Sequence, residues 1–157
     1  MDAIKWRKEK FPLLADFEDL KQLPLIKGTY FLSEHDKNNF IKVYQAAWEN
    51  SLIRYEAGNK DWSSYNSFNA EILNPLGRNS SIHIRIDDNQ DCLEVGTRYA
   101  REINLVPGWN KISIPLTEIA EGPENRTLDL KKIRFIYFYN QPEDFQWYGI
   151  DNLHLNN

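Results

Sequence analysis

Short runs of alternating apolar and polar residues recur along the whole chain. They are rich in β-branched and aromatic residues and are separated by clusters of Gly, Pro, Asn and Asp. A period of two residues is typical of β-strands, and many such strands in one chain predict an all-β sandwich. The predicted strands are residues 13–19, 30–33, 40–47, 51–56, 67–73, 81–87, 98–105, 111–115, 133–139 and 147–155.

The segments between these runs have the composition of loops. Residues 57–61 and 74–79 contain Gly, Asn, Asp or Pro, which favour turns or prevent ladder hydrogen bonds. Residues 116–120 are predicted to form one helical turn with Thr117 as its N-cap. Residues 1–11 are interpreted as a charged lead-in or linker segment, and residues 12–157 as one domain of two antiparallel sheets.

The run at residues 81–87 has the clearest alternation. Its three isoleucines, Ile82, Ile84 and Ile86, share one face of the predicted strand. His83, Arg85 and Asp87 share the other face. That polar face has two interpretations: the ordinary solvated side of an antiparallel sheet, or part of a binding site.

The run at residues 133–139 is apolar on both faces. If Ile136 and Phe138 point into the core, Tyr137 and Tyr139 point outward on the same sheet as the polar face of residues 81–87. With the opposite parity both tyrosines are core residues, and their buried hydroxyls need hydrogen-bond partners. We favour the first arrangement.

Composition and charge exclude several classes of protein. Among 157 residues, 23 acidic and 19 basic side chains are interspersed to give a net charge of -4, without the basic run that nucleic-acid binding requires. No apolar stretch approaches the roughly 18 residues of a membrane-spanning helix. The first ten residues are too charged for a signal peptide. The single cysteine, Cys92, excludes an internal disulfide and is predicted to be a small apolar strand residue.

Catalytic motifs are missing from the sequence. The histidines at 35, 83 and 154 lack metal-ligand spacing, and no serine lies in a nucleophile-elbow sequence. Asp87 and Asp88, followed by residues 89–91, are interpreted as a polar hairpin loop rather than as a catalytic carboxylate pair. We therefore expect a protein that is not an enzyme.

Five short motifs occur in a fixed order along the chain. They are L-A-D-F-E-D at residues 14–19, D-W-S-S-Y-N-S-F at 61–68, V-P-G-W-N-K-I-S-I-P-L at 106–116, L-D-L-K-K-I at 128–133 and Y-G-I-D-N-L at 148–153. Together they resemble a bacterial carbohydrate-binding module with the galactose-binding-like jelly-roll fold. In such modules Trp62 is chiefly architectural, and we expect Trp109 to be a core or rim residue.

The resemblance implies a non-catalytic domain that holds an oligo- or polysaccharide on its concave sheet. It also implies a larger parent polypeptide or a catalytic module as a partner, and favours an extracellular or periplasmic location. The alternative is a protein-interaction or assembly-factor domain on the same jelly roll, because one fold serves many functions.

A sugar site requires flat aromatic rings and planar or multi-acceptor groups that bond to hydroxyls. Side chains of these kinds occur on several predicted strands. The candidates are Tyr44, His83, Arg85, Asp87, Arg98, Tyr137 and Tyr139.

The resemblance further implies a structural Ca²⁺ where the first and last strands meet. Its ligands would be Glu18 and Asp151, helped by Asp16. The alternative is that Asp151 caps the turn of its strand and that Glu18 is a solvated edge acid.

Overall fold

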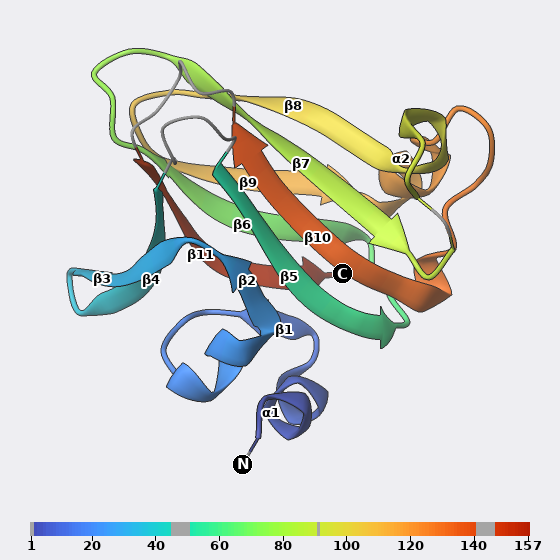
Figure 1. Ribbon diagram of the computed structural model, residues 1–157, viewed down its shortest axis with the longest axis horizontal. Coiled ribbons are helices and arrows are strands. Elements are labelled where there is room, and N and C mark those ends of the chain that lie inside the picture. Colours follow the sequence, from blue (N-terminus) through green and yellow to red (C-terminus); the bar gives the residue numbers. More distant parts are fainter. Residues whose placement is uncertain (1, 45–50, 91, 141–146) are drawn as a thin grey trace.

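The computed structural model describes residues 2–44, 51–90, 92–140 and 147–157 and has two antiparallel sheets that face each other (Figure 1). The first sheet contains β1 (Leu13–Ala15), β3 (Tyr30–His35), β4 (Asn38–Tyr44), β6 (Ser67–Asn74), β9 (Gly108–Pro115) and β11 (Trp147–Asn156). The second contains β2 (Ile26–Gly28), β5 (Ser51–Lys60), β7 (Ser80–Asp88), β8 (Tyr99–Leu105) and β10 (Ile133–Asn140). The helical elements are α1 (Ala3–Lys10), α2 (Leu116–Glu121) and the 3₁₀ turns η1 (Leu20–Leu25), η2 (Val95–Thr97) and η3 (Leu130–Lys132).

The strand order mixes distant parts of the sequence. The first sheet has the order β3-β4-β11-β6-β9, with β1 paired to β11, and the second has the order β2-β5-β10-β7-β8. In both sheets the last strands of the chain lie in the middle. The predicted all-β sandwich of two antiparallel sheets is confirmed. None of the helices that the structure describes is long and apolar enough to cross a membrane.

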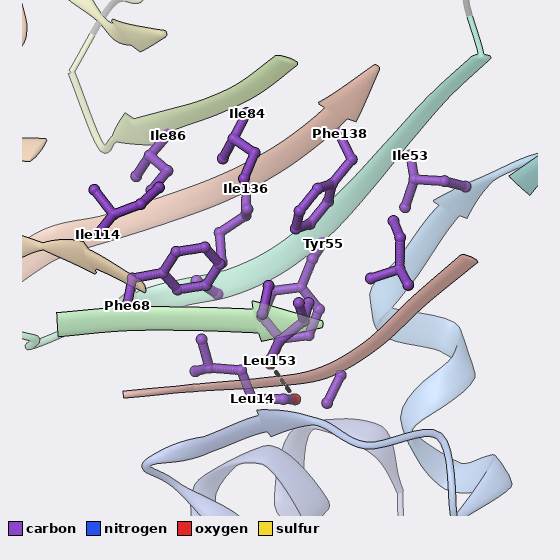
Figure 2. Packing of buried hydrophobic residues seen from close by; sticks show 14 of the residues in the cluster. Leu14, Ile53, Tyr55, Phe68, Ile84, Ile86, Ile114, Ile136, Phe138 and Leu153 are labelled. Atoms are coloured by element: carbon purple, nitrogen blue, oxygen red, sulfur yellow. Dashed lines mark hydrogen bonds between the residues drawn. The ribbon is translucent and has the colours of Figure 1, made fainter. Parts of the chain in front are cut away.

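The core lies between the two sheets and follows from the alternation of each strand. Along β6, Phe68, Ala70 and Ile72 are buried while the residues between them are partly exposed. Figure 2 shows side chains of the first sheet, such as Phe68 and Ile114, meeting those of the second, such as Ile136. A slip of one residue would turn each apolar set toward solvent, so burial fixes the register.

The side chains of β10 alternate as expected from the sequence, with Ile136 and Phe138 inward and Tyr137 and Tyr139 outward. Ile136 and Phe138 are fully buried, whereas Tyr137 and Tyr139 are partly exposed on the outer face of the second sheet. In the register, Ile136 lies between the inward residues Tyr55 and Ile86.

A buried hydrogen bond joins the N-terminal strand to the second sheet. The Tyr55 hydroxyl donates to the backbone oxygen of Leu14 at 2.8 Å, which Figure 2 shows within the core. Burial raises the pKa of Tyr55 above its ordinary value, so the hydroxyl remains a donor.

The N-terminal segment is not the predicted linker, because helix α1 belongs to the domain. Asp2 caps it by accepting from the backbone nitrogen of Lys5, and Trp6 is 1% exposed within the core cluster. A single apolar anchor in a charged run gives no amphipathic pattern, so the sequence did not reveal this helix.

Other boundaries also differ from the prediction. β5 continues through the expected loop at 57–61 as far as Lys60, because Gly58 and Asn59 adopt positive φ angles of 71° and 57° where the pairing register shifts. α2 begins after Pro115, without a side-chain cap from Thr117. β1 ends at Ala15, earlier than expected, and β2 was not predicted. Residues 45–47, expected at the end of a strand, lie outside the described residues.

Two neighbouring aromatic residues of β10, Phe138 and Tyr139, test which side chains of this strand face the core. Phe138→Ala should lower the free energy of unfolding by about 3–5 kcal/mol, the usual loss for a buried phenylalanine. Tyr139→Ala should cost only about 1 kcal/mol, because it removes an outer-face aromatic contact. Urea unfolding of both variants measures the difference, and equal losses would contradict the assignment of faces.

Candidate functional site

The outer face of the second sheet brings together aromatic and charged side chains from three adjacent strands. Because directly opposed residues of antiparallel strands point to the same side, the register of β5, β10 and β7 defines three rows. We call this surface the β10 face. Its rows are Leu52–Tyr139–His83, Arg54–Tyr137–Arg85 and Glu56–Phe135–Asp87.

The rings of the β10 face contact their neighbours across the strands. The His83 and Tyr139 rings are stacked with centroids 4.9 Å apart, and the Arg85 guanidinium lies 4.6 Å from the Tyr137 ring centroid. Arg54 lies 4.5 Å from the Phe135 centroid. At most one face of Tyr137 and of Tyr139 is therefore open to a ligand. Neither tyrosine hydroxyl bonds to another described residue, so both are free to donate or accept.

Asp87 holds Arg85 in place. The Arg85 Nε donates to Asp87 Oδ1 at 2.8 Å, and its Nη2 donates to Asp87 Oδ2 at 2.7 Å and to the Cys92 carbonyl at 3.1 Å. Asp87 is only 5% exposed. The Arg85 edge that carries Nη1 remains for a ligand, whereas both oxygens of Asp87 are already used.

Asp88 forms a second ion pair at the end of β7. Its carboxylate accepts from Arg126 Nη1 at 2.6 Å, from Arg126 Nη2 at 2.8 Å and from the Asp129 backbone nitrogen at 2.9 Å. Burial raises the pKa of this carboxyl, but the hydrogen bonds from Arg126, Asp129 and Gln90 outweigh burial and bring the pKa below its ordinary value. The interpretation of Asp87 and Asp88 as part of a polar hairpin loop is thus wrong, because both are buried residues of β7.

Cys92 also differs from the prediction. It is buried in the loop after β7 rather than in a strand, and its Sγ lies 3.2 Å from Arg126 Nη2. Burial, followed by the charge of Asp87, raises the pKa of the thiol, which disfavours the reactive thiolate.

Two hollows lie at opposite ends of β7. One, of about 250 Å³, is lined by residues that include Arg85, Arg134, Phe135 and Tyr137. The other, of about 410 Å³, is lined mainly by polar side chains: Arg78, Asn79, Ser80, Ser81, Glu102 and Asn104. The Ser80 hydroxyl and His83 Nδ1 are buried and have no partner among the described residues.

The structure brings five of the seven candidate residues together on the β10 face: His83, Arg85, Asp87, Tyr137 and Tyr139. Arg98 lies in the extended segment before β8, where its Nη1 is 3.4 Å from the Leu93 carbonyl. Tyr44 lies on the other sheet, paired with Trp147 and in edge contact with Phe31.

Sequence reasoning missed three members of the site: Arg54, Arg134 and Phe135. Arg54 reaches the β10 face only because β5 pairs with β10, and its own strand gave no signal of that neighbour. Phe135 and Arg134 lie where the register of β10 shifts, so strict alternation from Ile133 assigned them no clear face.

The candidate calcium ligands lie near the β3–β4 turn. Asp151 is 3% exposed, its Oδ2 accepts from Asn38 Nδ2, and Glu18 Oε1 accepts from the Asn39 backbone nitrogen at 2.6 Å. Burial, with the charges of Glu71 and Glu18, raises the pKa of Asp151 to about 6.

The fit to calcium rests on two carboxylates. Asp16 Oδ1 accepts from the Gln22 side-chain amide at 2.9 Å and from the Glu18 backbone nitrogen at 3.1 Å. Among the described residues, no group of three or more His, Cys, Asp and Glu side chains is arranged to hold a metal. Glu18 and Asp151 still supply the hard oxygens that Ca²⁺ prefers, and a cation would offset the acidic charge around Asp151.

The architecture matches solved structures closely. A family 11 carbohydrate-binding module from Clostridium thermocellum, in complex with a beta-1,3-1,4-mixed-linked tetrasaccharide, superposes with a TM-score of 0.70 at 20% identity, over 92% of this chain and 94% of that one. A family 28 module specific for non-crystalline cellulose matches with a TM-score of 0.61 at 12% identity, over 92% and 93% of the two chains.

This chain has the fold of the family 11 and family 28 carbohydrate-binding modules. The fold that the five sequence motifs implied is therefore confirmed. An exo-beta-agarase also matches, with a TM-score of 0.70 at 16% identity, over 92% of this chain but 24% of the agarase chain. No protein-family model matches the sequence, and no curated protein matches it either.

The Asp88–Arg126 pair predicts a pH-dependent stability. Asp88→Asn should lower the free energy of unfolding at pH 7 by about 3 kcal/mol, because it breaks a buried ion pair. The folded-state pKa of Asp88 is lowered, so the pair stabilises fully above the unfolded pKa of about 3.9 and this stabilisation is lost as the pH falls through the folded pKa.

Urea unfolding between about pH 7 and pH 2 measures the effect. The difference between wild type and Asp88→Asn should shrink below about pH 4. Asp36→Asn, at the exposed β3–β4 turn, is the matched control and should follow the wild type. A difference that stays constant to pH 2 would show that the ion pair does not stabilise the fold.

Proposed function

We propose that this protein is a non-catalytic carbohydrate-binding domain and that it holds an oligo- or polysaccharide on the β10 face. One observation carries the proposal: Tyr137, Tyr139, His83 and Arg85 converge on one sheet face. Hollows lie at both ends of that face. The solved structures with this fold include a module in complex with a tetrasaccharide.

The chemistry of the β10 face suits a polyhydroxylated ligand. The tyrosine hydroxyls and the free edge of Arg85 can bond to sugar hydroxyls, and the open ring faces can contact the apolar side of a pyranose. Asp87 fixes the Arg85 guanidinium before a ligand arrives, so binding orders fewer rotamers and costs less entropy.

Two features support a non-catalytic role. Glycoside hydrolysis needs two carboxyl groups flanking the bond, one with a raised pKa. On the β10 face, Asp87 is held by Arg85 and Glu56 lies 3.4 Å from Arg54. Asp151, the acid whose pKa is raised, lies on the other sheet.

A protein-interaction domain is the second candidate function. Phe31 and Leu32 are 61% and 41% exposed on β3, which is an edge strand of the first sheet. An exposed apolar edge is able to pair with another chain. This surface lies on a different sheet from the β10 face, so variants of each surface separate the two functions.

We also propose a catalytic partner and a structural calcium ion. The agarase match covers one quarter of a longer chain, which supports a role beside a catalytic module. Glu18 and Asp151 would hold the Ca²⁺ with carbonyl oxygens of nearby loops, and the ion would fasten the β3–β4 turn to β11.

Removal of the outer tyrosines tests the proposed site. After a glycan array has identified a ligand, Tyr137→Ala and Tyr139→Ala should each weaken its binding about tenfold in calorimetric titrations, because each loses a ring contact and a hydroxyl. Tyr44→Ala is the matched control, since Tyr44 is an exposed tyrosine of the other sheet. Equal weakening by all three variants, or an array without any bound glycan, would refute the β10 face as a sugar site.

Thermal unfolding tests the calcium site. Millimolar CaCl₂ added to chelator-treated protein should raise the Tm by about 5 °C or more at saturation, because an ion bound only by the folded state stabilises it. Asp151→Asn should abolish the rise, while Glu34→Gln, on the exposed side of β3, should keep it. No change in the wild-type Tm would mean that the calcium site does not exist.

A further inference from the structure

The charged side chains around the β10 face do not follow the acidic balance of the whole chain. The net charge of the protein is -4. On this face, however, the acids next to the aromatic rows are already neutralised: Asp87 pairs with Arg85, Asp88 with Arg126 and Glu56 with Arg54. What a ligand meets depends on the charges that remain.

Those remaining charges are mostly positive. The basic side chains of this region without a carboxylate within 4.0 Å among the described residues include Lys27, Arg78, Arg98 and Arg134. Lys27 of β2 lies opposite Arg54 of β5 in the strand register. Arg78 lines the larger hollow and Arg134 lines the hollow beside Tyr137. Among the described acids of this region, Glu102, opposite His83, and the exposed Glu94, next in sequence to Leu93 of the hollow beside Tyr137, have no basic side chain within 4.0 Å.

Unpaired positive charge is present at the hollow beside Tyr137. Arg134 is exposed there, and the Nη1 edge of Arg85 carries no bond to a described residue. Asp87 and Asp88, the carboxylates that line that hollow in the described part of the chain, are buried and paired, so they offer little repulsion to a bound anion. An anionic group seated there would meet guanidinium donors suited to paired hydrogen bonds.

We infer that the glycan bound by the β10 face is acidic and that its carboxylate or sulfate group sits in the hollow between Arg85 and Arg134. This inference rests on the proposed function and names the class of ligand. The arginines that stack on Tyr137 and Phe135 keep their charge while they cover ring faces, so the surface offers cationic edges as well as aromatic contacts.

A nucleic acid fits the same surface less well. Single-stranded nucleic acids bind through bases stacked on open aromatic faces along a groove that neutralises successive phosphates. Here one face of Tyr139 is covered by His83 and one face of Tyr137 by Arg85. Of the free cations, Arg78 and Arg134 line two separate hollows at opposite ends of β7 and do not follow one line along a strand.

The test compares acidic and neutral glycans on the wild-type protein. Polygalacturonate, alginate and heparin are the acidic probes, mixed-linked β-glucan and agarose the neutral ones, and a thymidine oligonucleotide the nucleic acid. At least one acidic glycan should bind 10-fold or more tightly than either neutral glycan at low salt, and its affinity should fall as salt screens the charges. Binding by polygalacturonate or alginate identifies a carboxylate ligand, and binding by heparin alone a sulfate ligand.

The other outcomes separate the two proposals. Binding of neutral glycans alone overturns the acidic ligand and leaves the proposed function standing. Binding of no glycan overturns both proposals. Tighter binding of the oligonucleotide than of every glycan also overturns the acidic-glycan assignment.

Two arginine variants locate the anion. Arg134→Gln should lower the affinity for the acidic glycan about tenfold and make that affinity less dependent on salt. The Tm of the protein should stay unchanged. Arg101→Gln is the matched control, because Arg101 is an exposed arginine of the same sheet whose side chain pairs with Glu118 of α2. Unchanged affinity in Arg134→Gln, or equal loss in both variants, would refute the assigned position.

Discussion

Strand β10 lies between β5 and β7 in the middle of the second sheet, so the direction of each of its side chains affects both the core and the outer face. Ile136 and Phe138 fill the space between the sheets, and their burial forces Tyr137 and Tyr139 outward. The same alternation in β7 turns Arg85 to the outside beside Tyr137. Hydrophobic burial in the core thereby assembles the aromatic and cationic side chains of the β10 face.

The end of β7 adds a second constraint. Asp87 and Asp88 are consecutive residues that hold two different arginines, one on the outer face and one from the segment before β10. Such buried pairs contribute less to net stability than their number suggests, because desolvation offsets much of the attraction. Their effect here is positional: they orient Arg85 and join the loop after β7 to residues 126–129.

Patterns within single strands were sufficient for the fold and for part of the site. The isoleucine alternation in β7 predicted which of its side chains reach the outer face, and the ordered motifs predicted the jelly roll. Pairing between strands was not predictable in this way. Arg54 joins Tyr137 because β5 and β10 are neighbours, although the two residues are 83 positions apart in the sequence. The pattern of β5 alone carries no sign of that pairing.

Helix α1 and the burial of Asp87 and Asp88 also differ from the prediction, and both depend on tertiary contacts that a local sequence pattern does not show. Trp6 anchors α1 through one buried ring, which leaves no periodic apolar stripe to recognise. Asp87 and Asp88 were interpreted as a polar hairpin loop because acids seldom enter a core. Their burial is offset by Arg85 and the distant Arg126, together with the Asp129 and Gln90 backbone nitrogens that donate to Asp88.

Chemical-shift mapping in solution shows which face of the protein a glycan binds. In a titration of ¹⁵N-labelled protein with a glycan that binds, we expect the shifted backbone and side-chain signals to cluster on β5, β7 and β10 and around the two hollows, while signals of β4 and β9 stay unchanged. Shifts confined to the outer side of the first sheet, or to the β3 edge, would contradict the assignment of the binding surface.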